Sequence, residues 1–329
     1  MSSTLGPRDR RGTWRARWGV GRMNYTVEPG LYALGQPDSA SPVFVTANYK
    51  MSFDRLRSSL AGRNAWILAL DTNGINVWCA AGKGTFGAPE LTRRVASSRL
   101  AEVVDHRRLI LPQLGAPGVA AHEVRRTSEF EVIYGPVEAE DIPAFLDAGL
   151  KASPSMRRKT FPIVERAALI PIELLAALKL FLFALPVLFL LCAIGNTQDM
   201  RANIAGFGAF SAVALLCAIL SGTVLTPLAL PWIPGRAFSL KGLIAGLAAV
   251  FVIAAFRHGM GGSSENQWEF LAWLLLIPSF SSYLGMNFTG SSTYTSLSGV
   301  RKEMRAALPL QIVGGAVGFG FLLASRLFP

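Results

Sequence analysis

Five apolar stretches after Leu169 limit what this chain can fold into. Each is close to the roughly 20 residues that a helix needs to cross the hydrocarbon core of a bilayer. Their presence, with a charged fraction of 16%, excludes a single water-soluble globule. We therefore predict an all-α transmembrane domain of about five helices, with spans near residues 171–194, 204–230, 238–256, 268–287 and 306–327.

The charged residues divide the chain in the same place. Residues 1–170 carry 39 charged side chains, whereas residues 171–329 carry 14. This contrast predicts a soluble N-terminal half and a membrane-embedded C-terminal half. We expect four segments: a basic, disordered extension (1–22), a soluble domain (23–150), a basic linker (151–168) and a transmembrane domain (169–329).

The net charge of +11 has a local origin. Six arginines and a single acid, Asp9, lie in the first 22 residues, and no apolar run follows them, which argues against a signal peptide. Met23 is an alternative start for the protein. Most of the other excess lies beside the predicted spans, so no nucleic-acid partner is expected.

The loops between the spans predict the orientation. The positive-inside rule places the more basic loops in the cytoplasm, which puts the soluble half in the cytoplasm and the C-terminus outside the inner (cytoplasmic) membrane. The basic residues on the predicted inner side are Lys151, Arg157, Arg158, Lys159, Arg166, Arg236, Lys241, Arg301, Lys302 and Arg305, against Arg201, Arg257 and Arg326 on the other.

The spans contain few charges, and this favours an anchor over a transporter. Lys179 lies in the first span and Glu269 at the edge of the fourth, so no buried proton relay is apparent. A run of hydroxyl side chains at 287–296 lies beside the membrane, where it could bind an ion or a partner.

The soluble half alternates short β-branched runs with helical segments. Such alternation predicts a small Rossmann-like α/β domain with a parallel sheet. Ligands of such sheets bind beyond the carboxyl ends of the strands, so the loops 71–74, 112–118 and 135–136 should line a site. The predicted strands are 43–46, 66–70, 109–111 and 131–134, and the predicted helices are 51–61, 89–104, 119–128 and 139–149.

Cys79 is the only cysteine of the soluble half, which excludes a disulfide framework there. The nearby Gly82-x-Gly84-x-x-Gly87 pattern follows its strand too late for a dinucleotide-binding fingerprint, and it is no Walker loop. Near a helix N-terminus, with Lys83 one turn on, the thiol should be biased towards the thiolate, which is a soft ligand or a nucleophile. A buried structural cysteine remains the alternative.

The segment from Asn76 to Gly87 reads Asn-Val-Trp-Cys-Ala-Ala-Gly-Lys-Gly-Thr-Phe-Gly. It resembles the signature N-(V/I)-W-C-A-(A/S)-G-K-(G/A)-x-F-G-T of the HgcA family, the membrane-bound corrinoid proteins of microbial mercury methylation. Eleven defined positions agree, and Ala88 stands in place of the final threonine, which puts a hydrogen bond of the cap helix in doubt. Further segments similar to this family or to the large subunit of the corrinoid iron-sulfur protein are 137–146, 156–158, 288–293 and 299–305.

The resemblance implies a corrinoid (cobalamin-type) cofactor and a methyl transfer from its cobalt to Hg(II), giving methylmercury. It implies that Cys79 is the lower axial ligand and the catalytic residue, supplied by a Rossmann-like corrinoid-binding domain. It also implies a ferredoxin-like 4Fe-4S electron donor and a methyl donor linked to methyltetrahydrofolate. The implied cofactor-binding residues are Asn76, Val77, Trp78, Cys79, Ala80, Ala81, Gly82, Lys83, Gly84, Thr85, Phe86 and Gly87.

Two alternatives stay open at this point. One is a membrane-anchored corrinoid methyl carrier of one-carbon metabolism with a different acceptor, because nothing in the motif specifies mercury. The other is a membrane binding protein in which Cys79 is structural.

Overall fold

The computed structural model describes residues 1–194, 200–259, 266–288 and 297–328. The chain forms two compact units, residues 1–160 and 161–329. The predicted linker, 151–168, is divided between them. The backbone carbonyl of Met156 accepts a hydrogen bond from the Val137 N–H in the first unit, and a long helix of the second unit begins at Ile163.

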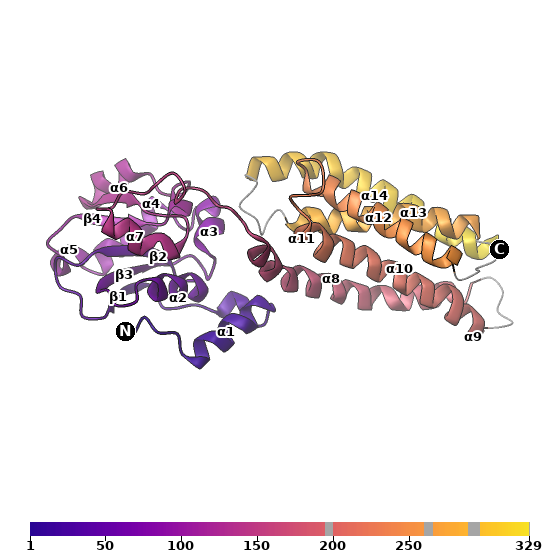
Figure 1. Cartoon of the computed structure of the whole chain (residues 1–329), viewed down its shortest axis with the longest axis horizontal. Helices are drawn as coiled ribbons and strands as arrows, with labels where there is room; N and C mark the ends of the chain where they lie inside the picture. Colours follow the sequence, from indigo (N-terminus) through magenta and orange to yellow (C-terminus); the bar gives the residue numbers. More distant parts are fainter. Residues whose placement is uncertain (195–199, 260–265, 289–296, 329) are drawn as a thin grey trace. The chain divides into compact units, whose positions relative to one another are not determined.

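The first unit is a five-stranded mixed sheet with strand order β1-β3-β2-β4-β5 (Figure 1). The four strands expected from the sequence are parallel to one another, as predicted for a Rossmann-like domain. The fifth, β1, was not predicted; it pairs antiparallel with β3 at the sheet edge. The strands are β1 (Gly30–Leu34), β2 (Val43–Ala47), β3 (Ala65–Leu70), β4 (Arg108–Leu111) and β5 (Glu131–Tyr134).

Successive residues of the parallel strands point to opposite faces of the sheet, and both faces are buried. Val43 and Val45 pack in one cluster with the helices that follow β3 and β4, whereas Phe44 packs in a second cluster. The first face is covered by α3 (Val77–Lys83), α4 (Ala88–Ser97), α5 (Leu100–Val103) and α6 (Ala121–Ser128), and the second by α2 (Lys50–Ser59) and α7 (Ile142–Asp147).

Two helical predictions differ from the structure in detail. The segment 89–104 is broken into α4 and α5 at Arg99, whose φ of 50° lies in the left-handed region. The segment 139–149 begins as a 3-10 turn, Ala139–Asp141, before α7.

The prediction of disorder for residues 1–22 is wrong. This segment contains helix α1 (Pro7–Arg17), and its single acid is the reason. The Asp9 carboxylate accepts hydrogen bonds from Lys50 Nζ at 2.7 Å and Arg57 Nη2 at 2.8 Å, both on α2. Lys50 lowers the pKa of Asp9 to about 2, with help from the Gly6 N–H and Arg57 and against the effect of burial. The charge pattern of residues 1–22 does not reveal these ion pairs, because the partners of Asp9 lie more than 40 residues away along the chain.

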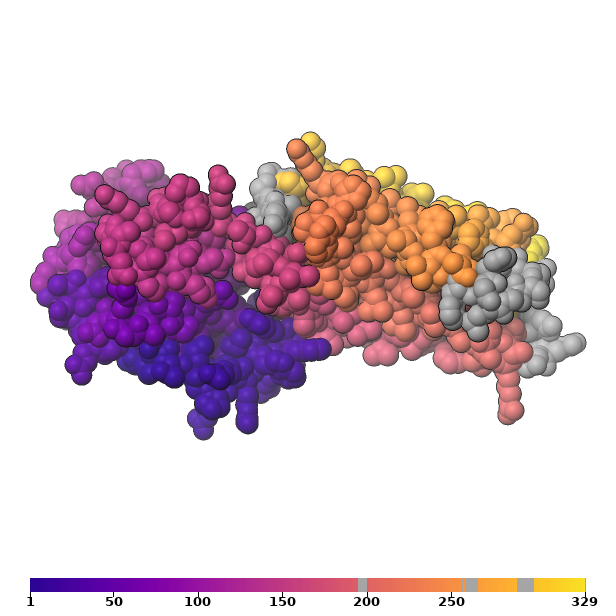
Figure 2. Space-filling model, in the orientation of Figure 1, coloured from indigo at the N-terminus to yellow at the C-terminus, as the bar shows by residue number. Residues whose placement is uncertain are grey.

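Five helical segments of the described residues are long and apolar enough to cross a membrane. They form the second unit, coloured from magenta at the start of α8 to yellow at the end of α14 in Figure 1, and Figure 2 shows the same residues as a continuous packed surface. These segments are α8 (Ile163–Cys192), Met200–Leu228, α12 (Phe238–Gly259, apolar over 238–255), α13 (Gln267–Asn287) and α14 (Leu297–Leu327).

The second of these segments is not one regular helix. It runs through α9 (Met200–Asn203), a π-helical turn (Ile204–Gly208), α10 (Ala209–Leu220), a second π-helical turn (Ser221–Leu225) and α11 (Thr226–Leu228). The predicted hydroxyl run is only partly visible, because 289–296 lie outside the described residues.

Helix α13 is the central helix of the second unit and packs against α10, α12 and α14. Glycines on α12 permit the close contact: a Cβ added at Gly246 would lie 2.7 Å from Pro278 Cα on α13. Two basic residues that the positive-inside rule places on the cytoplasmic side are buried here. Arg166 donates to the Leu228 carbonyl at 2.6 Å, and Lys241 Nζ donates to the Leu230 carbonyl at 2.6 Å.

Candidate functional site

The candidate site lies beyond the carboxyl ends of the parallel strands. Strand β3 ends at Leu70, and a turn at 71–76 leads into α3. The Asn76 side chain caps this helix: its Oδ1 accepts a hydrogen bond from the Cys79 N–H at 2.9 Å. Because Asn76 is a favoured N-cap residue, the short helix begins at a defined position and fixes the thiol in its first turn.

The two sides of α3 have different environments. Val77, Ala80 and Ala81 are buried in the core of the unit. Cys79 is half-buried, while Gly82 and Lys83 are exposed. Because residues three and four positions apart share one side of a helix, Cys79, Gly82 and Lys83 form an accessible stripe. Gly82 has no side chain, so a broad, flat group can approach the backbone one turn from the sulfur.

The end of α3 is shaped by Gly84, whose φ of 82° lies in the left-handed region. The Thr85 N–H and hydroxyl both donate to the Ala80 carbonyl, at 3.0 and 3.4 Å. Phe86 then enters the core with its side chain fully buried. These residues hold the helix in place, and their side chains do not line the stripe.

The loop after β4 packs closely against α3 and the residues that follow it. A Cβ added at Gly118 would lie 2.1 Å from the Phe86 carbonyl oxygen and 2.9 Å from Ala81 Cα. Only a glycine therefore fits this contact. The loop 112–118 therefore packs against α3, the helix that follows the loop 71–74. The Gln113 N–H donates to the Pro136 carbonyl at 3.3 Å, which brings the third predicted loop to the same edge.

Asn48, which directly follows β2 at this edge, is a site residue that the sequence patterns did not predict. Its buried Oδ1 accepts hydrogen bonds from the Thr72 N–H (3.0 Å), the Thr72 hydroxyl (2.9 Å) and the Gly74 N–H (3.2 Å). These bonds fix the turn that leads to α3. The signal was available, since a polar residue at the end of a parallel strand lies at the binding edge of the sheet.

Glu90, on α4, holds the same turn from the other side. Its carboxylate accepts a hydrogen bond from the Asp71 N–H at 2.9 Å. Burial alone would raise the pKa of Glu90, but this N–H, Arg93 and Arg94 together lower it. Glu90 is therefore ionised at neutral pH and keeps the turn ordered.

The expected bias of Cys79 towards the thiolate is not what the structure gives. Burial raises the pKa of the thiol above its usual value and outweighs Lys83, Arg22 and the Asn76 hydrogen bond, which lower it. The sequence predicts that the helix terminus and Lys83 lower the pKa of this thiol. The thiol is buried deeply enough that the cost of desolvating the thiolate is larger than their effect. The side chain is therefore a neutral thiol at pH 7 until a cation takes the place of its proton.

Within the described residues, neither histidine of the first unit is hydrogen-bonded to the Cys79 thiol. His106 precedes β4, at the amino end of the sheet, and its Nε2 lies 2.8 Å from the Ser41 carbonyl oxygen. His122 is exposed on α6. Ala88, the departure from the family signature, begins α4 and is buried, so it belongs to the next helix and not to the cap of α3.

The residues present fit a corrinoid. Among the described residues, no cluster of three or more His, Cys, Asp or Glu side chains could hold a bare metal ion. A single soft sulfur beside Gly82 suits a metal that brings its own planar ligand ring and needs one further ligand. Of the motif residues, Trp78 and Cys79 are half-buried and Lys83 is exposed, so their side chains are accessible from solvent.

Comparison with known proteins points to the same part of the chain. Residues 20–146 match the CO dehydrogenase/acetyl-CoA synthase delta subunit family. The chain is 31% identical over 126 residues to the corrinoid/iron-sulfur protein large subunit of Moorella thermoacetica, covering 38% of this chain and 28% of that protein. It is 31% identical over 128 residues to the acetyl-CoA decarbonylase/synthase complex subunit gamma of Archaeoglobus fulgidus, covering 38% and 27%.

The subunit gamma of Methanopyrus kandleri is 30% identical over 123 residues, covering 37% of this chain and 26% of that protein. The matched region thus spans about a quarter of the length of these relatives, and the family match ends before α8. The mixed α/β unit that carries Cys79 is therefore similar to the corrinoid proteins of the CO dehydrogenase/acetyl-CoA synthase delta subunit family.

Proposed function

We propose that this protein is a membrane-anchored corrinoid methyl carrier in which Cys79 is the lower axial ligand to the cobalt. The stripe of Cys79, Gly82 and Lys83 carries the proposal, because it presents one soft donor beside a surface without side-chain bulk. The similarity of residues 20–146 to a family that includes a corrinoid/iron-sulfur protein supports it independently.

The chain's own residues prepare the ligand. Asn76 and the turn fixed by Asn48 hold Cys79 in the first helical turn. The thiol releases its proton when it binds a metal, and Lys83 then lies where it stabilises the negative sulfur. A corrinoid bound here would supply a cobalt-bound methyl group that can leave with its electron pair, the form that a soft metal ion accepts.

We further propose that the acceptor is Hg(II) and that the product is methylmercury. Support comes from the resemblance of Asn76–Gly87 to the signature of the HgcA family and from the five apolar helices that follow the α/β unit. On this proposal a ferredoxin-like 4Fe-4S protein supplies electrons and a methyltetrahydrofolate-linked protein supplies methyl groups. The chain would be a multi-pass protein of the cytoplasmic membrane, with the α/β unit in the cytoplasm and the C-terminus outside.

The relatives support a second acceptor. Their names place them in acetyl-CoA decarbonylase/synthase complexes, so a role in one-carbon metabolism without mercury is the alternative. Methylmercury formation by cells with and without this chain separates the two. Deletion of the gene should abolish methylmercury formation, and output that stays unchanged would contradict mercury as the acceptor.

The cofactor proposal has its own test. The full chain, purified in detergent and reconstituted with a cobalamin, should retain cobalt with an absorbance spectrum that Cys79→Ala alters. Cys217→Ala, on α10, is the matched control and should leave the spectrum as it is. A chain that retains no cobalt, or a spectrum insensitive to Cys79→Ala, would rule out thiolate ligation.

A further inference from the structure

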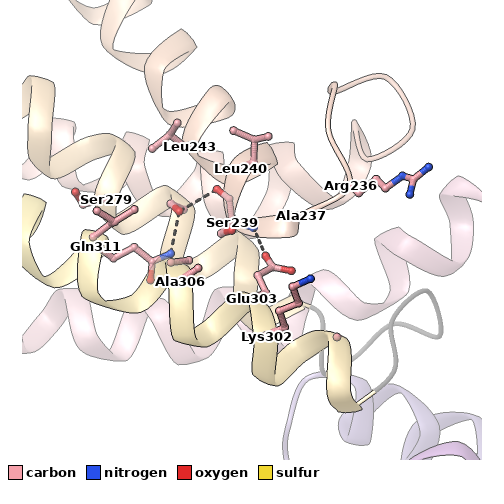
Figure 3. A pocket seen from close by; sticks show the side chains of 14 residues that line it. Arg236, Ala237, Ser239, Leu240, Leu243, Ser279, Lys302, Glu303, Ala306 and Gln311 are labelled. Carbon is pink, nitrogen blue, oxygen red and sulfur yellow. Dashed lines mark hydrogen bonds between the residues drawn. The ribbon is translucent and has the colours of Figure 1, made fainter.

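A cavity of about 800 Å³ lies in the second unit, among α12, α13 and α14 (Figure 3). Such a volume is within the range of small-molecule sites. The side chains that line it come from the start of α12, the middle of α13 and the first four turns of α14. The proposed function gives this cavity no role.

The two ends of the cavity differ in charge. Lys302 and Arg236 lie towards one end, with the Arg236 side chain extending outward, and Ser279 and Gln311 lie at the other (Figure 3). Lys302 and Gln311 are nine residues apart on α14, so the ends are about 13 Å apart along the helix. Among the residues that the structure describes, neither Arg236 nor Lys302 makes an ion pair or a side-chain hydrogen bond.

The acid at the charged end is already engaged. Glu303 Oε1 accepts a hydrogen bond from the Ser239 N–H at 2.6 Å, in the first turn of α12. The carboxylate thus caps a helix N-terminus, where a negative charge is stabilising. The positive charges of Arg236 and Lys302 remain for a ligand.

The walls of the cavity are partly polar and partly apolar. Gln311 Nε2 donates to Ser282 Oγ at 2.9 Å, and Ser282 Oγ donates to the Ser239 carbonyl at 2.9 Å. The Ser279 hydroxyl has no hydrogen bond within the described residues and can donate to a ligand. Leu240 and Leu243 are 43% and 37% exposed, so this side of the cavity is continuous with the apolar surface of the unit.

From this arrangement we infer that the cavity binds an anionic glycerophospholipid. The phosphate lies at Arg236 and Lys302, a carbonyl oxygen of the glycerol esters accepts a hydrogen bond from Ser279, and the acyl chains pass over Leu240 and Leu243. Basic pockets between membrane helices select anionic head groups in this way. The apolar wall favours a lipid over a free phosphate, because a free phosphate would make no contact with Leu240 and Leu243.

The test uses the full chain in detergent and native mass spectrometry with phosphatidylglycerol or phosphatidylcholine of identical acyl chains. Phosphatidylglycerol should be retained preferentially. Arg236→Gln and Lys302→Gln should each weaken its binding by about fivefold. Arg301→Gln is the matched control, since this exposed arginine is one residue from Lys302 and does not line the cavity. Equal retention of the two lipids, or an equal effect of Arg301→Gln, would overturn the inference.

Two further arms separate the site from general attraction to charge. Ala306→Phe fills the cavity without changing any charge and should abolish selective retention, provided that the variant elutes as the parent does. Ser279→Ala is the milder substitution and should weaken binding in the same direction. Glycerol 3-phosphate should not displace the lipid. Displacement by it, or unchanged lipid retention in both cavity variants, would show that the lipid site is elsewhere.

Discussion

The side-chain oxygen of Asn76 lies 2.9 Å from the backbone nitrogen of Cys79 and accepts its hydrogen bond. The residue that caps α3 therefore also sets the position of the candidate cobalt ligand. Since α3 has only seven residues, it has few other hydrogen bonds of its own to hold its first turn.

Asn76→Ala should destabilise α3 by about 1 kcal/mol, because the first turn loses its cap. Faster amide hydrogen exchange in residues 77–83 would show this, together with a lower fraction of cobalamin retained after gel filtration. Asn76→Asp keeps a capping oxygen and is the control. If Asn76→Ala exchanges no faster than the parent, the cap does not order the helix.

Cys79 should react slowly with iodoacetamide at pH 7 in the cofactor-free protein, because burial raises the pKa of its thiol. Only the thiolate reacts, so the rate should keep increasing above pH 9, where an exposed thiol is already levelling off. Lys83→Gln removes a charge that lowers this pKa and should slow the reaction further, while Lys83→Arg should not. Mass spectrometry of the peptide that contains Cys79 gives the rate, and unfolded protein provides the reference. Rapid modification at pH 7 would contradict this environment.

Asp9→Asn should loosen α1 from α2, because Lys50 and Arg57 each lose an ion-pair partner. The sign of the pH dependence follows from the lowered pKa. Asp9 titrates at about 2 in the folded chain and near 3.8 when unfolded, so its contribution is complete above pH 3.8 and is lost as the pH falls towards 2. The contribution is on the order of 2 kcal/mol. Hydrogen exchange in residues 7–17 measures it, with Asp38→Asn, outside this cluster, as the control; equal protection in Asp9→Asn and the parent would refute it.

Gly246→Ala should destabilise the second unit by about 1 to 3 kcal/mol, because the new methyl group meets the backbone of α13 at 2.7 Å from Pro278 Cα. Gly315→Ala is the matched control on α14, where an added Cβ meets nothing within 4 Å. Thermal unfolding of the detergent-solubilised chain should separate the two variants. Equal midpoints would mean that α12 and α13 are less closely packed than the structure has them.

The sequence by itself determined the division of the chain, the parallel strands and the place of Cys79. Apolar runs near 20 residues and β-branched runs between turns are local patterns, and the carboxyl edge of a parallel sheet follows from strand direction alone. The short edge strand β1 was not predicted, because its stability comes from pairing with β3, more than 30 residues away.

Only the tertiary structure decided how the site residues divide their roles. Phe86 and Ala80 share a motif with Cys79, but they are buried in the core, and Asn48 enters the site from another strand. Burial by surrounding segments raises the pKa of Cys79, and ion pairs with Lys50 and Arg57 let Asp9 order α1. Burial and ion pairing depend on which distant segments surround a side chain, and no local pattern contains that information.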